Sequence, residues 1–408
     1  MKLQRNDTML TIEEALQQVL SSVKPVKDEE LLPLLEAYHR VLAHPQFAKS
    51  HVPPTDVSAM DGYAVQVDDL KAGEWIPISQ RIPAGQSPTA LAPNTAARIF
   101  TGSVIPPRAN AVVIQENCET RDGKVKLLEV PRAGDNIRRR GQDLENGSEV
   151  LTAGHYLRPQ DLGLLAASGV DRVSVFRPLR VAVLSSGDEL VEPGHGLAPG
   201  QIYNANRYTL FGLLSGINME PHHYPPIPDN LEATETALAQ AATECDVILT
   251  TGGVSVGEED HIKQAIDSLG ELSLWKLKIK PGKPLAFGAI NSVKGPTPLF
   301  GLPGNPVAVF VTFILIVRPY LLAMQGRRDF RADTQFYPAN FTIERPNSRQ
   351  EYIRVRIDGG KLEKYRSQDS AVLSSTAWAN GLAIIPPDST VTHGDQLEVI
   401  PFSHLGSL

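Results

Sequence analysis

The chain has 408 residues, of which 42% are hydrophobic and 21% charged, and its formal net charge is −7. This length is too great for one hydrophobic core, so we expect roughly two to four domains. The acidic balance argues against a non-specific nucleic-acid binder, which needs a basic face. The two cysteines, Cys118 and Cys245, are far apart in sequence, which argues against a disulfide framework or a cysteine-based zinc site and fits a reducing compartment.

The sequence also argues against membrane targeting. The first residues lack the apolar segment of a signal peptide. The longest apolar stretch, 307–317, is too short to cross a bilayer and predicts a buried helix. We therefore expect a cytoplasmic protein that binds neither membranes nor nucleic acid.

The first elements of the chain have helical patterns. Thr11, followed three residues later by Glu14, forms a capping box, which predicts a helix over 11–23. Apolar residues at helical spacing predict a second helix over 28–42. A further helix is expected over 159–168, and it could rejoin the first two.

Three regions of different composition and pattern follow along the chain. Residues 53–143 are rich in proline, glycine and short β-type runs, which is typical of a small β domain. Residues 180–324 alternate strands with helices, which indicates a mostly parallel sheet covered by helices. Short β-type runs over 336–401, including 341–343, predict a small barrel or sandwich.

These patterns predict a multidomain fold of the α/β plus β class. It has a central three-layer α/β domain, a β-rich inserted domain, a discontinuous helical or mixed N-terminal domain and a small C-terminal β-barrel. The predicted boundaries are 1–48 with 144–178 for the N-terminal domain, 49–143 for the inserted domain, 179–326 for the α/β domain and 327–408 for the barrel.

Three apolar strands of the α/β region each end in a Gly-rich turn. The turns are S-S-G-D-E at 185–189, T-T-G-G-V-S-V-G at 250–257 and G-L-P-G-N-P at 301–306. Open α/β sheets bind ligands beyond the carboxyl ends of their strands, so we predict one shared crevice. Glycines let backbone N–H groups approach an anion, although an ordinary tight turn explains 250–257 equally well on sequence alone.

Basic and acidic residues surround the predicted crevice. The run W-K-L-K-I-K-P-G-K-P at 275–284 is either an edge strand protected by lysines or a site for phosphate or another tetrahedral oxyanion. We favour the oxyanion site because the run adjoins the crevice. Carboxylates at strand ends could hold Mg²⁺ together with phosphate, and the spacing does not select among them. The chain has no H-E-x-x-H or G-x-S-x-G motif, so a zincin and a nucleophile elbow are unsupported.

Six motifs, in one order over 58–306, resemble those of the MoeA-type molybdopterin molybdenumtransferases, a family related to the E domain of gephyrin. The motifs are S-A-M-D-G-Y-A-V, N-I-R-R-R-G-Q-D, S-S-G-D-E-L, T-T-G-G-V-S-V-G-E-E-D, W-K-L-K-I-K-P-G-K-P and G-L-P-G-N-P. The resemblance covers essentially the whole chain. It implies a MogA-like central domain, an elongated four-domain subunit and a homodimer. It also implies Mg²⁺-dependent insertion of molybdate into adenylylated molybdopterin, with release of AMP.

The resemblance also implies which residues act. The residues matched to catalytic positions are Asp61, Thr101, Asp143, Glu189, Asp260, Lys276 and Lys280, and Mg²⁺ is assigned to Glu189 and Asp260. Those matched to substrate binding are Ser186, Gly187, Asp188, Asp229, Gly252, Gly253, Ser255, Lys283, Pro303, Pro306, Arg354 and Ser370. Lysines, an arginine and a serine can hold the molybdate dianion by charge-assisted hydrogen bonds.

The chain departs from the family pattern at Asn204, Ala205 and Ala308, where relatives often carry an acid or a hydroxyl. These departures motivate an alternative, a non-catalytic paralogue that binds molybdopterin or partner proteins as a scaffold. A further hypothesis, which does not depend on the resemblance, is that the protein is a different Mg²⁺-dependent nucleotide hydrolase. The expected protein partners are the molybdopterin adenylyltransferase and the chaperones of molybdoenzymes.

Overall fold

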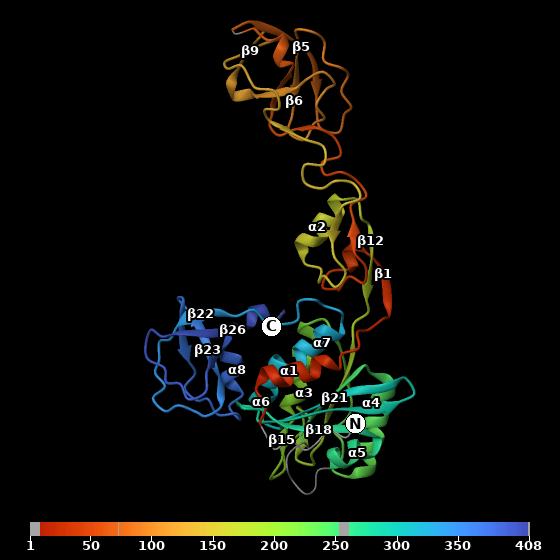
Figure 1. The fold of residues 1–408 in the computed structure, drawn as a ribbon, viewed down its shortest axis with the longest axis vertical. Helices are drawn as coiled ribbons and strands as arrows, with labels where there is room; N and C mark the ends of the chain where they lie inside the picture. The colour runs from red at the N-terminus through yellow and green to blue at the C-terminus, as the bar shows by residue number, and fades with distance from the viewer. Residues whose placement is uncertain (1–8, 72, 253–260, 407–408) are drawn as a thin grey trace.

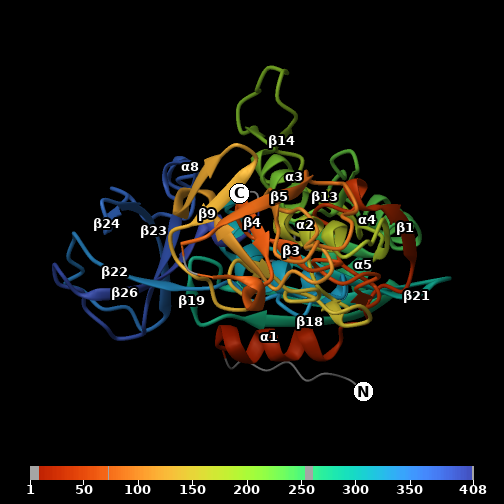
Figure 2. The same cartoon turned by 90° about the horizontal axis from the view of Figure 1, so that it is seen from above.

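The structure is a computed structural model that describes residues 9–71, 73–252 and 261–406. The molecule is elongated (Figure 1). A β domain stands at one end, a small layer containing β1, β12 and α2 follows, and the α/β domain lies at the other end beside the C-terminal β domain. Seen from above, α1 and the loop around β14 lie on opposite sides of the α/β domain (Figure 2).

The first helix, α1 (Ile12–Ser21), forms with the predicted capping box. Thr11 Oγ1 accepts a hydrogen bond from Glu14 N (3.2 Å), and the Glu14 carboxylate accepts one from Thr11 N (2.8 Å). Its buried residues Ala15, Leu16 and Val19 belong to the core of the α/β domain. The helix therefore packs against the long helix at 306–324.

The predicted helix over 28–42 is wrong. This segment forms β1 (Glu29–Pro33) and a 3-10 turn, η1 (Leu34–Glu36). β1 pairs antiparallel with β12 (Arg172–Phe176). Pro33 has no N–H to donate in a helix interior, and the distant β12 supplies a better set of partners. The predicted helix at 159–168 is confirmed as α2 (Pro159–Ala167), which packs on this layer.

The inserted β domain forms as predicted. Its sheet has the order β7-β4-β6-β5-β9-β8, where the strands are β4 (Gly62–Val65), β5 (Trp75–Ile82), β6 (Ala96–Ile99), β7 (Ala111–Ile114), β8 (Cys118–Arg121) and β9 (Lys124–Leu127). The short elements around it are β2 (Gln46–Phe47), β3 (Val57–Ser58), η2 (Val67–Asp69), η3 (Gln115–Asn117), β10 (Ile137–Arg138) and β11 (Glu149–Leu151). The chain enters and leaves through an antiparallel bridge between Val52 and Leu144.

The α/β domain contains a mostly parallel sheet, as predicted, with the order β16-β13-β17-β21-β20-β18. The strands are β13 (Arg180–Ser185), β16 (Glu220–His223), β17 (Val247–Thr251), β18 (Gly270–Lys276), β20 (Pro284–Ser292) and β21 (Gly295–Leu302), with β14 (Leu190–Val191) and β15 (Ile202–Tyr203) as a separate pair. β20 runs antiparallel to its neighbours β18 and β21, and the other pairs in this sheet are parallel.

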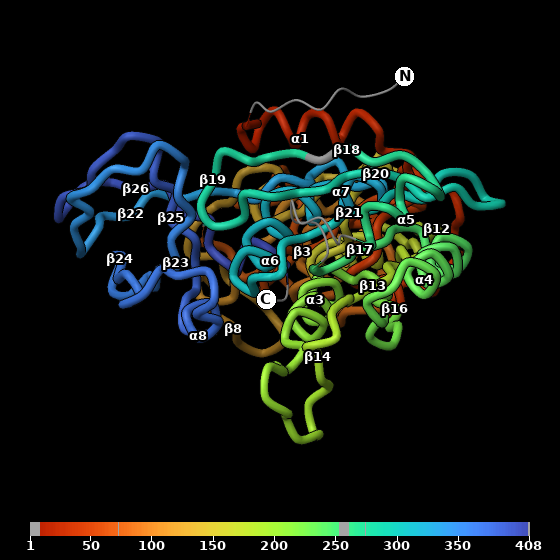
Figure 3. Tube along the Cα trace, turned by 90° about the horizontal axis from the view of Figure 1, so that it is seen from below, coloured from red at the N-terminus to blue at the C-terminus, as the bar shows by residue number. Residues whose placement is uncertain are grey.

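Helices cover both faces of this sheet, which makes three layers (Figure 3). One face carries α4 (Leu231–Glu244) and α5 (His261–Leu269), and the other carries α3 (Ala205–Gly216) and the helix at 306–324. That last helix consists of α6 (Pro306–Thr312), a π-helical segment (Phe313–Val317) and α7 (Arg318–Met324). It is apolar and long enough to cross a membrane, but 83% of its apolar window is buried within the fold. It is therefore the core helix that the sequence predicts.

The C-terminal β domain is the predicted small barrel. The sheet has the order β19-β23-β25-β26-β22, with β24 beside β23. The elements are β19 (Ile279–Lys280), β22 (Gln335–Pro338), β23 (Gln350–Asp358), β24 (Lys361–Lys364), α8 (Ser374–Trp378), β25 (Gly381–Ile385), β26 (Gln396–Pro401) and η5 (Phe402–His404). A bridge between Ala339 and Leu362 closes the barrel. The predicted strand at 341–343 does not form, because only Ile343 pairs, in a bridge to Val391.

Candidate functional site

The candidate site begins at the carboxyl edge of three neighbouring parallel strands. Ser185 of β13 lies opposite Thr251 of β17, and Thr251 lies opposite Leu302 of β21. The hydroxyl oxygens of Ser185 and Thr251 are 3.3 Å apart. The three Gly-rich turns therefore start side by side, which confirms that they share one edge of the sheet.

The turn after β13 brings its acids to the loop that follows β16. Asp188 Oδ1 accepts a hydrogen bond from Asp229 N (3.2 Å). Gly187 has φ 146°, and a Cβ there would collide with the Glu189 carboxylate. A glycine is therefore needed at Gly187 for Glu189 to fold back over the turn. Asp188, Glu189 and Asp229 are all exposed at this edge.

The turn after β17 approaches the first turn closely. Gly252 has φ 82°, and a Cβ there would lie 3.0 Å from the carbonyl oxygen of Ser186. The backbones of the two turns therefore lie close together at Ser186 and Gly252. The predicted site residues Gly253, Ser255 and Asp260 come next and lie outside the described residues.

Lys276 lies at the same edge of the sheet as the three turns. β18 and β21 run in the same direction because both pair antiparallel with β20. Gly301 lies opposite Ala286, and Lys276 lies opposite Pro284, two residues nearer the edge. Lys276 is therefore level with Pro303, the first residue after β21. The chain then turns back so that Leu277 N donates to the carbonyl oxygen of Lys283 (2.6 Å), which places Lys283 beside this strand end.

Lys280 forms an ion pair with Glu351 of the barrel. Its Nζ lies 2.8 Å from Glu351 Oε1, and the side chains of Lys280 and Glu351 are 45% and 13% exposed. The pair forms because β19 runs parallel to β23 of the barrel. The predicted basic stretch is therefore partly neutralised at Lys280 and anchored to the barrel.

The turn after β21 contacts two other elements. Asn206, near the start of α3, donates from Nδ2 to the carbonyl oxygen of Gly304 (2.7 Å). Val307 N donates to the carbonyl oxygen of Ser370 in the barrel (3.1 Å). Pro303 is buried, and Pro306 occupies the first turn of α6, where its missing N–H costs nothing. Asn206 was not predicted as a site residue from the sequence. The signal for it was the N-A-N-R stretch at 204–207, which is typical of the start of a helix and forms the start of α3.

Arg354 supports this region from inside the barrel. Only 1% of the residue is exposed. Its Nη2 donates to the carbonyl oxygen of Asp369 (3.0 Å), and its Nε donates to Ser375 Oγ (3.1 Å). Burial lowers the pKa of Arg354 to about 10. The guanidinium thus holds the turn that carries Ser370, rather than standing open at the crevice.

The predicted residues of the β domain are not brought to the crevice within one subunit (Figure 1). Asp61 Oδ1 accepts hydrogen bonds from Thr101 N (2.7 Å) and Thr101 Oγ1 (2.8 Å). The Thr101 backbone N–H, then its hydroxyl, and the positive charge of Arg98 lower the pKa of Asp61. Asp61 is thus an ordered carboxylate that Thr101 holds in place. Asp143 is exposed beside the Val52–Leu144 bridge, and its N–H donates to Val52 O (2.9 Å).

Two buried polar atoms lie in the elements that form this strand edge. Thr250 Oγ1 and Asn206 Oδ1 are buried and have no hydrogen-bond partner in the described part of the chain. Within residues 9–71, 73–252 and 261–406, no group of three His, Cys, Asp or Glu side chains could hold a metal alone. One or two carboxylates with substrate phosphate are the usual Mg²⁺ ligands, and the acids at this edge fit that pattern.

The fold and the crevice define a multidomain α/β protein whose ligand site lies at the strand ends, flanked by a β-barrel. Three family models match the chain: the MoeA N-terminal region (domain I and II) at 10–169, a probable molybdopterin binding domain at 182–323 and the MoeA C-terminal region (domain IV) at 337–402. The chain belongs to the MoeA family.

Curated relatives and solved structures agree with this assignment. The molybdopterin molybdenumtransferase of Haemophilus influenzae is 35% identical over 97% of this chain and 100% of its own length. The protein of the same name from Nostoc is 34% identical over 89% of this chain and 86% of its own length. The crystal structure of the molybdopterin biosynthesis protein MoeA from Pyrococcus horikoshii has a TM-score of 0.83 and 30% identity, covering 96% of this chain and 99% of that one.

Proposed function

We propose that this protein is a molybdopterin molybdenumtransferase of molybdenum cofactor biosynthesis. It would insert molybdate into adenylylated molybdopterin and release AMP in a Mg²⁺-dependent step. The observation that carries the proposal is the convergence of the Asp188–Glu189 turn, Gly252 and Lys276 at one strand edge. The names of the curated relatives support the same activity.

The residues at the edge have complementary tasks. Backbone N–H groups at the Gly252 turn would receive the phosphate of the adenylylated substrate. Lys276, Lys280 and Lys283 would hold the molybdate dianion by charge-assisted hydrogen bonds, and Ser370 would add a hydroxyl. Glu189 and Asp260 would hold Mg²⁺, which neutralises phosphate charge as the phosphoanhydride breaks. Bringing two anions together is the difficult part, and the lysines offset their repulsion.

A homodimer would complete the site. Asp61 and Thr101 form an ordered pair in the β domain, which stands at the opposite end of the subunit from the α/β domain. In a dimer of elongated subunits, the β domain of one protomer can face the α/β crevice of its partner. We propose that Asp61, Thr101 and Asp143 act in this way, each on the substrate bound by the other protomer.

The test is a single-turnover mixture of protein, adenylylated molybdopterin, Mg²⁺ and molybdate. AMP release and pterin-bound molybdenum are measured together. We expect both to appear, and both to depend on molybdate. Tight pterin binding without AMP release would instead establish the scaffold reading. Adenylate release from ATP, without the pterin, would establish a nucleotide hydrolase.

The proposed activity also implies a cellular location and protein partners. A cytoplasmic enzyme of this kind would receive adenylylated molybdopterin from the adenylyltransferase. It would pass the completed cofactor to chaperones of molybdoenzymes. Co-purification of the tagged protein with either partner would support direct transfer.

A further inference from the structure

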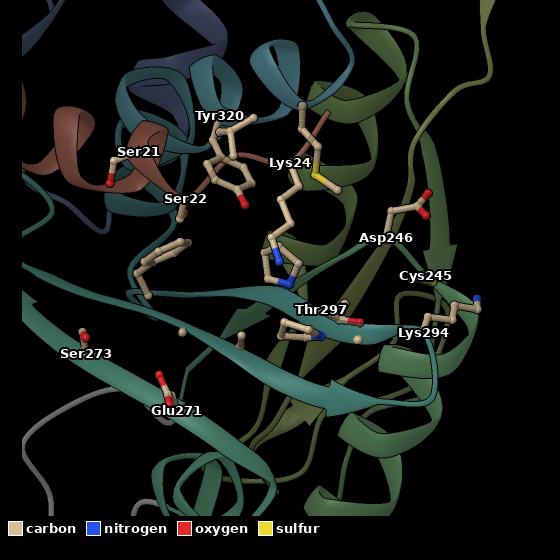
Figure 4. A pocket seen from close by; sticks show the side chains of 18 residues that line it. Ser21, Ser22, Lys24, Cys245, Asp246, Glu271, Ser273, Lys294, Thr297 and Tyr320 are labelled. Carbon is tan, nitrogen blue, oxygen red and sulfur yellow. The ribbon is translucent and has the colours of Figure 1, made fainter. Parts of the chain in front are cut away.

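A second cavity, of about 650 Å³, lies at the opposite end of the parallel strands from the crevice (Figure 4). It opens between the end of α1, α7 and the β20–β21 hairpin. β21 lines it at Gly295–Pro298, whereas the crevice begins at Pro303, roughly 17 Å further along the strand. The cavity is therefore separate from the proposed molybdenum-insertion site.

The cavity has the make-up of a small-molecule site. Apolar groups form most of its wall, among them Phe287, Pro296 and Met324. The Phe287 ring lies 5.8 Å from the ring of Tyr320, in an edge-to-face arrangement. Volumes between about 300 and 1,000 Å³ with apolar walls and a few polar groups are typical of ligand pockets.

The hydroxyl of Tyr320 is the first polar group in this wall. Tyr320 is fully buried, and no group in the described part of the chain meets hydrogen-bond geometry with its hydroxyl, although the nearby Ser22 hydroxyl partly offsets the effect of burial on the pKa of Tyr320. The neighbouring Ser22 hydroxyl donates its own proton to Val19 O (2.7 Å). Burial raises the pKa of Tyr320 to about 12, so the phenol keeps its proton and can donate it. An unpaired buried hydroxyl is costly, and a ligand that accepts its proton would remove that cost.

The second polar group is Lys24. Figure 4 shows its side chain extending from the end of α1 into the same space as the Tyr320 hydroxyl. None of the described acidic side chains forms an ion pair with Lys24. Asp246, an acid of the cavity lining, is already paired, because Arg177 binds both of its oxygens (2.7 and 2.8 Å).

The remaining charges leave the cavity with a preference for anions. Burial raises the pKa of the Cys245 thiol, so that group is neutral. Glu271 and Lys294 are both exposed at the rim, where solvent screens them and their charges offset each other. Lys24 is exposed as well, so solvent also weakens its charge, but it is the ammonium of the lining that extends into the cavity beside Tyr320.

We propose that this cavity binds a small organic carboxylate with an apolar, flat body. The carboxylate would pair with Lys24 and accept the Tyr320 proton, and the body would lie against Phe287 and the hairpin prolines. This site is independent of the proposed molybdenum insertion, since none of its residues lies at the crevice.

Calorimetric titration of the full-length protein tests the proposal with 2-naphthoate and its neutral isostere, 2-naphthamide. We expect 2-naphthoate to bind roughly tenfold more tightly than 2-naphthamide, because only the acid can pair with Lys24. No binding of 2-naphthoate at millimolar concentration, or equal binding of both probes, would overturn the proposal.

Two variants assign the effect to the named groups. Lys24→Met keeps the apolar stem and should reduce 2-naphthoate binding to the level of 2-naphthamide, whereas Lys27→Met, an exposed lysine outside the cavity, should change nothing. Tyr320→Phe should weaken 2-naphthoate several-fold. Its melting temperature should not fall, because the hydroxyl has no hydrogen bond within the described fold to lose. Unchanged affinity in both Lys24→Met and Tyr320→Phe would place the probe elsewhere and refute the site.

Discussion

Lys280 Nζ and Glu351 Oε1 lie 2.8 Å apart, so an ion pair joins the basic stretch of the α/β domain to the barrel. The lysine is the more exposed partner, at 45% against 13%. Half of its surface thus faces outward while the carboxylate fixes its position. Such an arrangement suits a lysine that binds an anion from a defined place.

Lys280→Met should lower the single-turnover rate of molybdate-dependent AMP release by roughly a hundredfold, because one cation is lost from the oxyanion site. The melting temperature should change little, since a half-exposed pair contributes less than about 1 kcal/mol. Glu351→Gln, which leaves the lysine in place, should cost less than tenfold. A wild-type rate for Lys280→Met would remove this lysine from the proposed site.

Gly187→Ala should damage the acidic turn. The new Cβ would displace the Glu189 carboxylate, and φ 146° would add strain of about 1–3 kcal/mol. We expect a rate loss of roughly tenfold to a hundredfold from the misplaced carboxylate. Gly196→Ala is the matched control in the following loop, where a Cβ meets nothing within 4 Å. Equal rates in the two variants would mean that the turn does not position Glu189 for the reaction.

Complementation between subunits should reveal a shared site. Asp61→Ala disables the β domain, and Lys280→Met disables the crevice, so each homodimer is inactive. A co-expressed equal mixture should recover about a quarter of the wild-type rate, because half of the dimers contain one intact site. Asp61→Ala mixed with Thr101→Val should recover none, since both changes lie in the β domain. No recovery in the first mixture would argue that the β domain acts within its own subunit or not at all.

Asp161 should make the small layer sensitive to acid. Burial alone would raise its pKa, but hydrogen bonds from Arg158 and His155 outweigh it and lower the pKa to about 2. A lowered carboxyl pKa stabilises the folded state above the unfolded value, and this stability is lost as the pH falls towards 2.

Asp161→Asn should therefore lower the free energy of unfolding by about 1–2 kcal/mol at pH 6, after allowing for solvent screening. The difference from wild type should shrink between pH 4.5 and pH 3. Urea titrations of both proteins at several pH values measure it. A difference that does not change with pH would show that packing, rather than charge, accounts for the effect.

Local signals in the sequence were sufficient where neighbouring residues decide the structure. The Thr11–Glu14 capping box predicted the start of α1, and apolar runs predicted β13, β17 and β21. The 28–42 segment failed because its apolar spacing fits a helix, while its partner strand β12 lies far along the chain. Such long-range pairing is invisible in one segment, and Pro33 was the local warning.

The site was predictable to a similar degree. Residues at strand ends converge because parallel strands share an edge, so Ser186, Asp188 and Gly252 could be grouped from sequence. The residues that hold the site in place could not be predicted from the sequence. Glu351, which binds Lys280, and Asn206, which binds the Gly304 carbonyl, come from distant elements, and sequence alone shows no reason to pair them. Domain boundaries and the individual roles of the site residues remain predictions.

The bridge between Val52 and Leu144 makes the β domain a detachable module. Val52 N donates to Leu144 O (2.8 Å), and Leu144 N donates back to Val52 O (3.3 Å), so the entering and leaving segments are already held together. Antiparallel residues that exchange both hydrogen bonds have Cα atoms roughly 5.5 Å apart. One or two glycines could therefore replace the whole of 53–143 without moving either flank. In evolutionary terms, this protein could gain, lose or exchange that domain in a single recombination event while its crevice stays intact.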